Sequence, residues 1–155
     1  MALEQNNLSL LNYKFKLSAV PNIEYRVQTL SLPGMDLGEA TMPTPFVRIT
    51  NPGNLTYGDL SVTFLVGEEM KDYLEIYNWM VALGHPDSLE QYTGERHDAS
   101  VMILSSAMRP IINVRFTDVY PASISPIDFD TTLTEVQYAT ATATFRFNRM
   151  YYDAI

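Results

Sequence analysis

The chain has 155 residues, of which 46% are hydrophobic and 18% are charged. This balance is typical of one folded domain with a single hydrophobic core, and it excludes a disordered chain. The formal net charge of −8 argues against specific binding of nucleic acid, and the absence of cysteine excludes disulfides, thiolate catalysis and cysteine metal sites.

The N-terminus shows no targeting signal. Residues 1–10 have no basic stretch followed by an apolar segment, so we expect no signal peptide and predict a flexible N-terminus. The sequence has no run of about 18 apolar residues, the length that a membrane helix requires. These features predict a protein that is made in the cytosol and has no contact with a membrane.

The first third of the chain predicts a hairpin followed by an arm. Residues 11–19 alternate apolar and polar side chains, which is typical of a half-buried strand, and residues 23–31 resume the pattern after Pro21 and Asn22. Residues 32–45 contain three prolines and two glycines. Because proline lacks an N–H group and glycine weakens a strand, this segment is predicted to be a long loop or arm.

The middle of the chain predicts two strands and a helix. Residues 46–50 and 57–67 read as strands on either side of a turn at 51–54. In residues 68–84 the apolar period changes to three and four, which indicates an amphipathic helix that Gly84 and Pro86 end. Glu68, Glu69 and Asp72 are expected in its first turn, where the helix dipole favours anions.

The last third predicts a polar loop and three more strands. Residues 85–100 are rich in turn formers, and residues 101–106 and 111–119 read as an antiparallel pair. Residues 132–152 are predicted to form one long closing strand with alanines on one face, against which the helix would pack closely. The predicted fold is therefore mainly β, an antiparallel sandwich or small barrel with one packed α-helix, in one domain over residues 1–155.

Two groups of residues are candidates for chemistry. Asp128 and Asp130 flank Phe129, so that both carboxylates could bind calcium or act as an acid–base pair, but no further ligand follows and the pattern favours a turn. His85 and His97 lack the spacing of a zinc site. No serine elbow, phosphate loop or dinucleotide fingerprint occurs. The sequence thus predicts a protein without catalytic activity, metal or cofactor.

The acidic residues are concentrated in one segment. Residues 59–98 contain nine acids and two bases, while the other bases lie in the flanking sequence. A chain polarised in this way could stack on copies of itself, acidic face to basic face, and the alternative is an ordinary solvated surface. The predicted stacking charges are Glu68, Glu69, Asp72 and Glu75.

Three short stretches carry a resemblance to a known family. They are "LPG" at 32–34, "YNWM" at 77–80 and "FTDVYPASISPIDFD" at 116–130. With the order of elements over residues 11–152, they resemble the tail-tube proteins of contractile-tailed, T-even-like bacteriophages. The resemblance implies a tail-tube-like fold in a structural subunit of hexameric rings, stacked into a tube whose lumen conducts DNA. Similar sequences also include tube initiators at the baseplate–tube junction and ring proteins of type VI secretion-like or other contractile injection systems, and a β-rich baseplate component outside the tube is a further alternative.

The resemblance also implies sites and partners. The inter-subunit arm would be formed by residues 32–45, namely Pro33, Gly34, Met35, Asp36, Met42, Pro43 and Pro45. The stretch 116–130 would be a corner between two strands, shaped by Ser123, Ser125 and the prolines. The expected partners are copies of the chain itself, tail sheath, tape measure and baseplate proteins, and DNA that slides past an acidic lumen. The expected location is the virion tail, after assembly in the host cytoplasm.

Overall fold

The structure is a computed structural model that describes residues 6–155, apart from the side chains at positions 92 and 93. Half of the predicted flexible segment 1–10, residues 1–5, therefore lies outside the described residues. The elements are, in chain order, β1 (Tyr13–Leu17), the short 3-10 helix η1 (Pro21–Ile23), β2 (Val27–Ser31), β3 (Met35–Met42), β4 (Ile49–Tyr57), β5 (Leu60–Leu65), α1 (Lys71–Gly84), α2 (Leu89–Gly94), β6 (His97–Leu104), β7 (Pro110–Ile124), β8 (Thr140–Arg146) and β9 (Arg149–Ala154).

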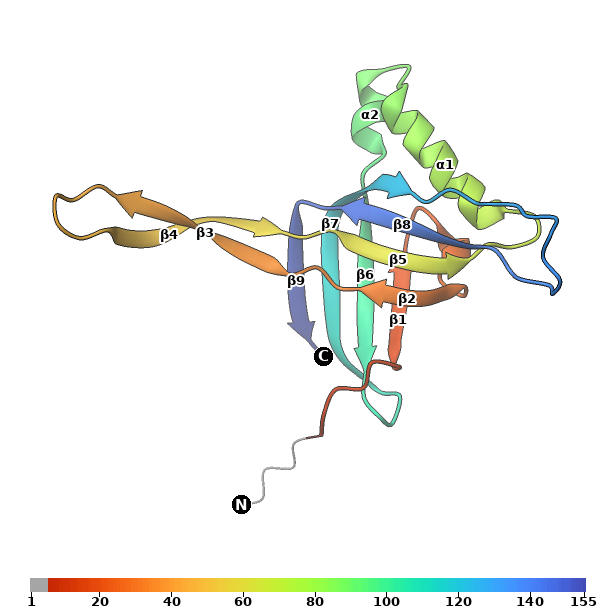
Figure 1. Cartoon of the computed structure of the whole chain (residues 1–155), viewed down its shortest axis with the longest axis horizontal. Coiled ribbons are helices and arrows are strands. Elements are labelled where there is room, and N and C mark those ends of the chain that lie inside the picture. Colours follow the sequence, from red (N-terminus) through yellow and green to blue (C-terminus); the bar gives the residue numbers. More distant parts are fainter. Residues whose placement is uncertain (1–5) are drawn as a thin grey trace.

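Two antiparallel sheets share the long strand β7 and run in different directions across the body (Figure 1). The first sheet has the order β1-β6-β7-β9, and the second sheet has the order β7-β8-β5-β2. Strand β7 changes sheets near Asp118, which has a positive φ of 55° and lies where the register with β6 shifts. Such a bulge bends a strand and increases its twist, which lets one strand serve both sheets.

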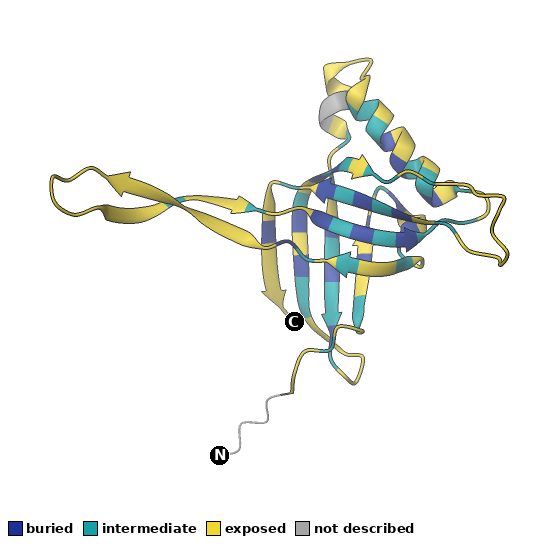
Figure 2. Ribbon diagram, viewed as in Figure 1, coloured by how far each residue is buried: buried dark blue, intermediate teal, exposed yellow. Residues whose placement is uncertain are grey.

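The core fills the space between the inner faces of the sheets (Figure 2). The predicted alternation is confirmed in β1, β5 and β8, where every second side chain is buried. Four phenylalanines are fully buried, and each contributes on the order of 1.5–3 kcal/mol through loss of apolar contact with water; they are Phe15, Phe64, Phe116 and Phe145. The prediction of a mainly β fold with one packed helix is confirmed.

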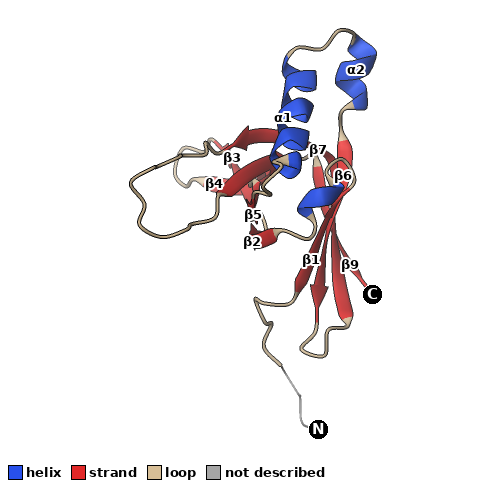
Figure 3. Ribbon diagram, turned by 90° about the vertical axis from the view of Figure 1, so that its right-hand side faces the viewer, coloured by secondary structure: helices blue, strands red, loops and turns tan. Residues whose placement is uncertain are grey.

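Helix α1 packs against the strands as predicted (Figure 3). Ile76 and Trp79 are buried, and the Trp79 ring lies 6.1 Å from the Phe145 ring of β8. The helix begins at Lys71, later than predicted, so that Glu68 and Glu69 precede it and only Asp72 lies in its first turn. The reason is that Met70 adopts the left-handed conformation and stops the helix from extending backwards.

The predicted hairpin of residues 11–19 and 23–31 is wrong. Strand β1 pairs with β6 in the first sheet, whereas β2 pairs with β5 in the second. Helix η1 separates them, with Val20 and Ile23 fully buried on either side of the turn. Burial of these two apolar side chains turns the chain from one sheet to the other, which the alternation alone could not reveal.

Residues 32–45, predicted to be a long loop or an arm, are not an irregular loop, because most of this segment is strand β3 of a long β-ribbon. Strand β3 pairs with β4 in a separate two-stranded sheet that projects from the body (Figure 1). The predicted turn at 51–54 lies inside β4, at a bulge where Gly53 faces Gly38. A Cβ atom on Gly53 would lie only 2.8 Å from the Gly38 carbonyl carbon, so these glycines permit the close backbone approach.

Three boundaries in the second half of the chain differ from the prediction. The loop predicted at 85–100 contains α2, and β6 begins at His97 instead of residue 101. The single closing strand predicted at 132–152 is a loop up to residue 139, followed by β8 and β9. These two strands are not continuous, because the chain turns a corner at Phe147 and Asn148, where the Asn148 amide side chain donates to Asp118.

Candidate interaction surfaces

The arm is the most exposed part of the described chain. We define it as β3, β4 and the connecting residues 43–48, and nearly all of its residues are exposed (Figure 2). Its exposed apolar side chains are Met35, Leu37, Met42, Phe46, Val47, Ile49 and Leu55. A two-stranded ribbon that buries so little is marginally stable in water alone, and this number of exposed apolar side chains on one ribbon indicates a partner.

The predicted arm residues lie at both ends of this ribbon. Pro33 is buried at its base, where the Gly58 N–H donates to the Gly34 carbonyl over 2.9 Å. Met35 and Asp36 form the first pairs of the ribbon with Tyr57 and Thr56. Met42 ends β3, and Pro43 and Pro45 follow it in the connection at the tip.

Sequence reasoning missed the second half of the arm, strand β4 and the tip. Phe46 at the tip is 97% exposed, the highest value among the large apolar side chains. The usable signal was the cross-strand pattern: Leu37 faces Leu55 and Met42 faces Ile49, so that apolar residues pair on one ribbon. The proline and glycines of residues 51–54 concealed that pattern, because they indicate a turn.

The four predicted stacking charges differ in their surroundings. Glu68 and Glu69 are exposed, and a Glu69 carboxylate oxygen lies 2.7 Å from Lys71 Nζ. Glu75 is half-buried and accepts a hydrogen bond from the Asn22 side chain. Asp72 is only 2% exposed, so it cannot meet a charge on another chain without rearrangement. Glu68 and Glu69 are therefore the two of the four that are free to contact a neighbour.

Asp72 has a structural role at the start of α1. Its carboxylate accepts hydrogen bonds from the N–H of Gly67 and of Tyr73, at 3.4 and 2.9 Å, and Met70 at the helix start supplies no side-chain cap. We expect Asp72→Ala to lower the free energy of unfolding by roughly 1–3 kcal/mol, because buried N–H groups lose their acceptor. Urea denaturation measures this. The double variant Glu68→Gln, Glu69→Gln is the control, and an equal loss in that variant would contradict a structural role specific to Asp72.

Asp128 and Asp130 lie in the loop between β7 and β8, where Asp130 makes the local hydrogen bonds of a turn. Asp130 accepts hydrogen bonds from the Thr132 N–H at 2.8 Å and from its hydroxyl at 2.6 Å. These two bonds lower the pKa of the Asp130 carboxyl below its ordinary value. Directly after β7, Ser125 extends the pairing of β7 with β8. Its N–H donates to the Thr142 carbonyl at 2.9 Å, and its hydroxyl oxygen accepts from the Thr142 N–H at 2.8 Å.

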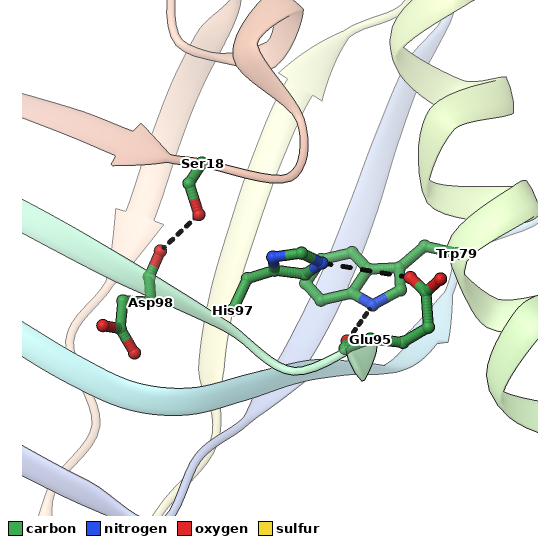
Figure 4. A network of polar contacts seen from close by, with 5 residues as sticks. All are labelled: Ser18, Trp79, Glu95, His97 and Asp98. Atoms are coloured by element: carbon green, nitrogen blue, oxygen red, sulfur yellow. Dashed lines mark hydrogen bonds and ion pairs between the residues drawn. The ribbon is translucent and has the colours of Figure 1, made fainter. Parts of the chain in front are cut away.

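The two histidines have separate structural surroundings. His85 follows α1, and its N–H donates to the Val81 carbonyl. His97 packs its ring edge-on against Trp79, whose indole N–H donates to the Glu95 carbonyl at 2.5 Å (Figure 4).

Within residues 6–155, no three histidines, aspartates or glutamates gather as a metal site would require. None of the helices in that range is long and apolar enough to cross a bilayer.

The first sheet ends in two strands whose outer edges pair with no described strand. These are β1 on one side and β9 on the other. An open strand edge presents N–H and C=O groups that can pair with a strand of another chain. The two edges border the same four-stranded sheet, so one copy can in principle join its β9 to the β1 of the next.

A groove lies between the residues that directly precede β2 and α1 and the loop of residues 125–139. It is lined by Arg26 and Met70 together with Ile127, Phe129 and Tyr138 of the loop. Phe129 and Tyr138 are more than four fifths exposed. The groove therefore adds a second apolar surface on the side of the body away from the arm (Figure 1).

No protein-family model matches the chain. In sequence, the chain is 24% identical to the tail tube terminator protein of Enterobacteria phage T4 over a 112-residue alignment, and the match covers 68% of this chain and 64% of that protein. The match thus spans slightly less than two thirds of the relative's length.

Solved structures share the fold over almost the whole chain. The cap of the anti-feeding prophage, described as its tube terminating cap, has a TM-score of 0.74, with 13% identity and full coverage of both chains. A chain from the sheath–tube complex of an extracellular contractile injection system, PVC, also has a TM-score of 0.74, with 11% identity and coverage of 98% and 95%. The fold is therefore one that contractile injection systems use.

Proposed function

We propose that the chain is a structural subunit of the ring that ends the tube of a contractile tail. The observation that carries this proposal is the sequence match to the T4 tail tube terminator. The fold supports a contractile tail but does not separate a tube end from the tube, because structures of both kinds of complex are similar to it. The comparisons thus favour a tube end over the tube subunit that the sequence predicts.

Ring formation in this proposal uses the open edges of the first sheet. If β9 of one copy pairs with β1 of the next, the first sheets of all copies join and no edge of the first sheet remains open. The second sheet and α1 pack on the core face of the first sheet. In a closed ring there is more space on the outer side than on the side of the channel. The second sheet and α1 would therefore lie outside, and the open face of the first sheet would line the channel.

The arm would fasten the ring to its surroundings. It projects beyond the body, and its apolar surface suits a neighbouring subunit or the adjoining ring of the tube. The tail sheath is a further expected neighbour at a tube end, with the tape measure protein and DNA inside the channel. The number of copies expected from the family resemblance is six. Such a protein acts by shape and contact, without a reaction to catalyse.

Electron microscopy of the purified protein tests the proposal. A terminating ring should appear as single rings or pairs of rings, and it should not grow into tubes at any concentration. When it is added to polymerising tube protein from the same phage, the tubes should become shorter and carry a ring at one end. Growth of long tubes from this chain alone would mean that it is the tube subunit instead.

A further inference from the structure

The open face of the first sheet carries most of its charged side chains as bases. Lys14 and Lys16 alternate with the buried Phe15 in β1, and Arg115 lies between the buried Val114 and Phe116 in β7. Arg149 precedes the buried Met150 in β9. Because neighbours along a strand point to opposite faces, all four bases lie on the face away from the core.

The pairing register spreads these bases across the whole sheet. Lys16 faces Ser100 of β6, Ser100 faces Arg115, and Arg115 faces Tyr151 of β9. One row across the four strands thus carries a base in β1 and a base in β7. Four strands span roughly 14 Å, because neighbouring strands lie about 4.8 Å apart. The bases therefore form a broad and flat array, not a cluster at one point.

The charge of this face is opposite to that of the chain. On the described strands of the first sheet, the four bases share the open face with Asp98 and Asp153, and a third exposed acid, Asp118, lies opposite Asp98 at the bulge in β7. Asp153 is partly neutralised, since its carboxylate lies 3.6 Å from Arg115 Nε. The chain as a whole has a net charge of −8. A positive face on so acidic a protein indicates an anionic partner.

The two arginines share Tyr151 as a neighbour on this face. The Arg115 guanidinium lies 5.0 Å from the centre of the Tyr151 ring. A hydrogen bond to the Tyr151 side chain raises the pKa of Arg149.

We propose that this face, formed by Lys14, Lys16, Arg115 and Arg149, binds the phosphate backbone of duplex DNA without reading its sequence. Duplex DNA carries one negative charge per about 1.7 Å of its length, so a face of this width meets several phosphates at once. A flat array fits a uniformly charged rod, whereas an acidic peptide needs pockets for its side chains or a free edge to pair with.

This inference deepens the proposed function and rests on it for the presence of DNA, while a single chain has all the groups that binding requires. In the proposed ring, the same face would line the channel, which would then be basic where the sequence predicts an acidic lumen. The basic face would hold DNA at the tube end, while exposed acids such as Glu68 and Glu69 lie elsewhere on the body.

The test measures binding of a short fluorescent DNA duplex by anisotropy at about 50 mM salt and over a salt series. Non-specific contacts of this kind have dissociation constants of about 10⁻⁴–10⁻⁶ M, with a logarithmic salt slope of about −2 to −4 for two to four phosphates. The variant Lys14→Gln, Lys16→Gln, Arg115→Gln, Arg149→Gln should bind at least about tenfold more weakly and lose most of that slope.

A matched control neutralises four exposed bases away from this face, namely Arg26, Lys71, Arg96 and Arg146, and so changes the net charge equally. It should retain most of the affinity, and an equal loss in both variants would overturn the proposal. The pair Lys14→Gln, Lys16→Gln tests the face without touching the Arg115 contacts and should lose affinity in part. If a glutamate-rich peptide binds the face and DNA does not, the proposal is wrong. Sedimentation of the same samples reports ring formation separately.

Discussion

Replacing residues 37–55 with a two-residue Asn-Gly turn should leave a folded protein that no longer assembles. The deletion removes most of the arm and keeps its base, where Asp36 faces Thr56 and can be joined by a short hairpin turn. Folding should persist because the ribbon is a separate sheet and the core residues lie in the body. The expected result is a monomer with a melting temperature within a few degrees of the parent, by calorimetry and sedimentation.

The apolar tip of the arm supplies a sharper variant. Phe46→Ser with Val47→Ser removes two exposed apolar side chains and leaves the ribbon pairs intact. Assembly should weaken strongly if these side chains are buried at a neighbour, since each contributes on the order of 1.5–3 kcal/mol per chain. Leu10→Ser with Leu11→Ser is the control, because these residues are also exposed but precede β1 and lie outside the arm. Rings that form unchanged without the arm would contradict its role as a contact.

The sequence predicts the fold class and most strands because local patterns survive in the fold. Burial alternates with period two in β5 and β8, and the apolar spacing of α1 places Ile76 and Trp79 inside. Pairing is different, since it depends on residues far apart in the chain. Nothing local indicates that β1 would pair with β6, more than eighty residues later, in preference to β2.

The sequence predicts an arm in this part of the chain but not a two-stranded ribbon, because a proline and a glycine there indicate a turn although they lie in a strand. Pro52 and Gly53 normally indicate a turn, and in this chain they occupy a bulge in β4. A proline is tolerated in this position because both strands of a two-stranded sheet are edge strands. We expect the exposed apolar residues around them, such as Leu37 and Leu55, to contact another chain.

The sequence shows which side chains are charged, but it does not show which of them are exposed or which face they share. Glu68, Glu69, Asp72 and Glu75 look alike in sequence, and only the position of the helix start separates Asp72 from the others. The basic face could not be found from composition, because Lys16 and Arg115 meet only when β1, β6 and β7 are placed in register. A net charge describes the whole chain, whereas contacts depend on single faces.

Tyr152→Pro should abolish ring closure while leaving the monomer folded. Directly after β9, the Ile155 N–H donates to the Ile111 carbonyl of β7, and backbone N–H groups alternate between the two edges of an antiparallel strand. The N–H of Tyr152 therefore points to the outer edge, where the β1 strand of a neighbouring copy would accept it. Proline removes that donor and adds a ring at the contact, and edge strands tolerate it.

Sedimentation velocity and electron microscopy measure the outcome, and urea denaturation measures the stability of the monomer. The variant should sediment as single chains, with a free energy of unfolding within about 1 kcal/mol of the parent. Tyr152→Ala is the matched control, because it removes the same side chain but keeps the N–H, and it should still form rings. If both variants form rings equally well, closure does not run through the β9 edge. If the alanine variant also fails, the tyrosine side chain makes the contact instead of the backbone ladder.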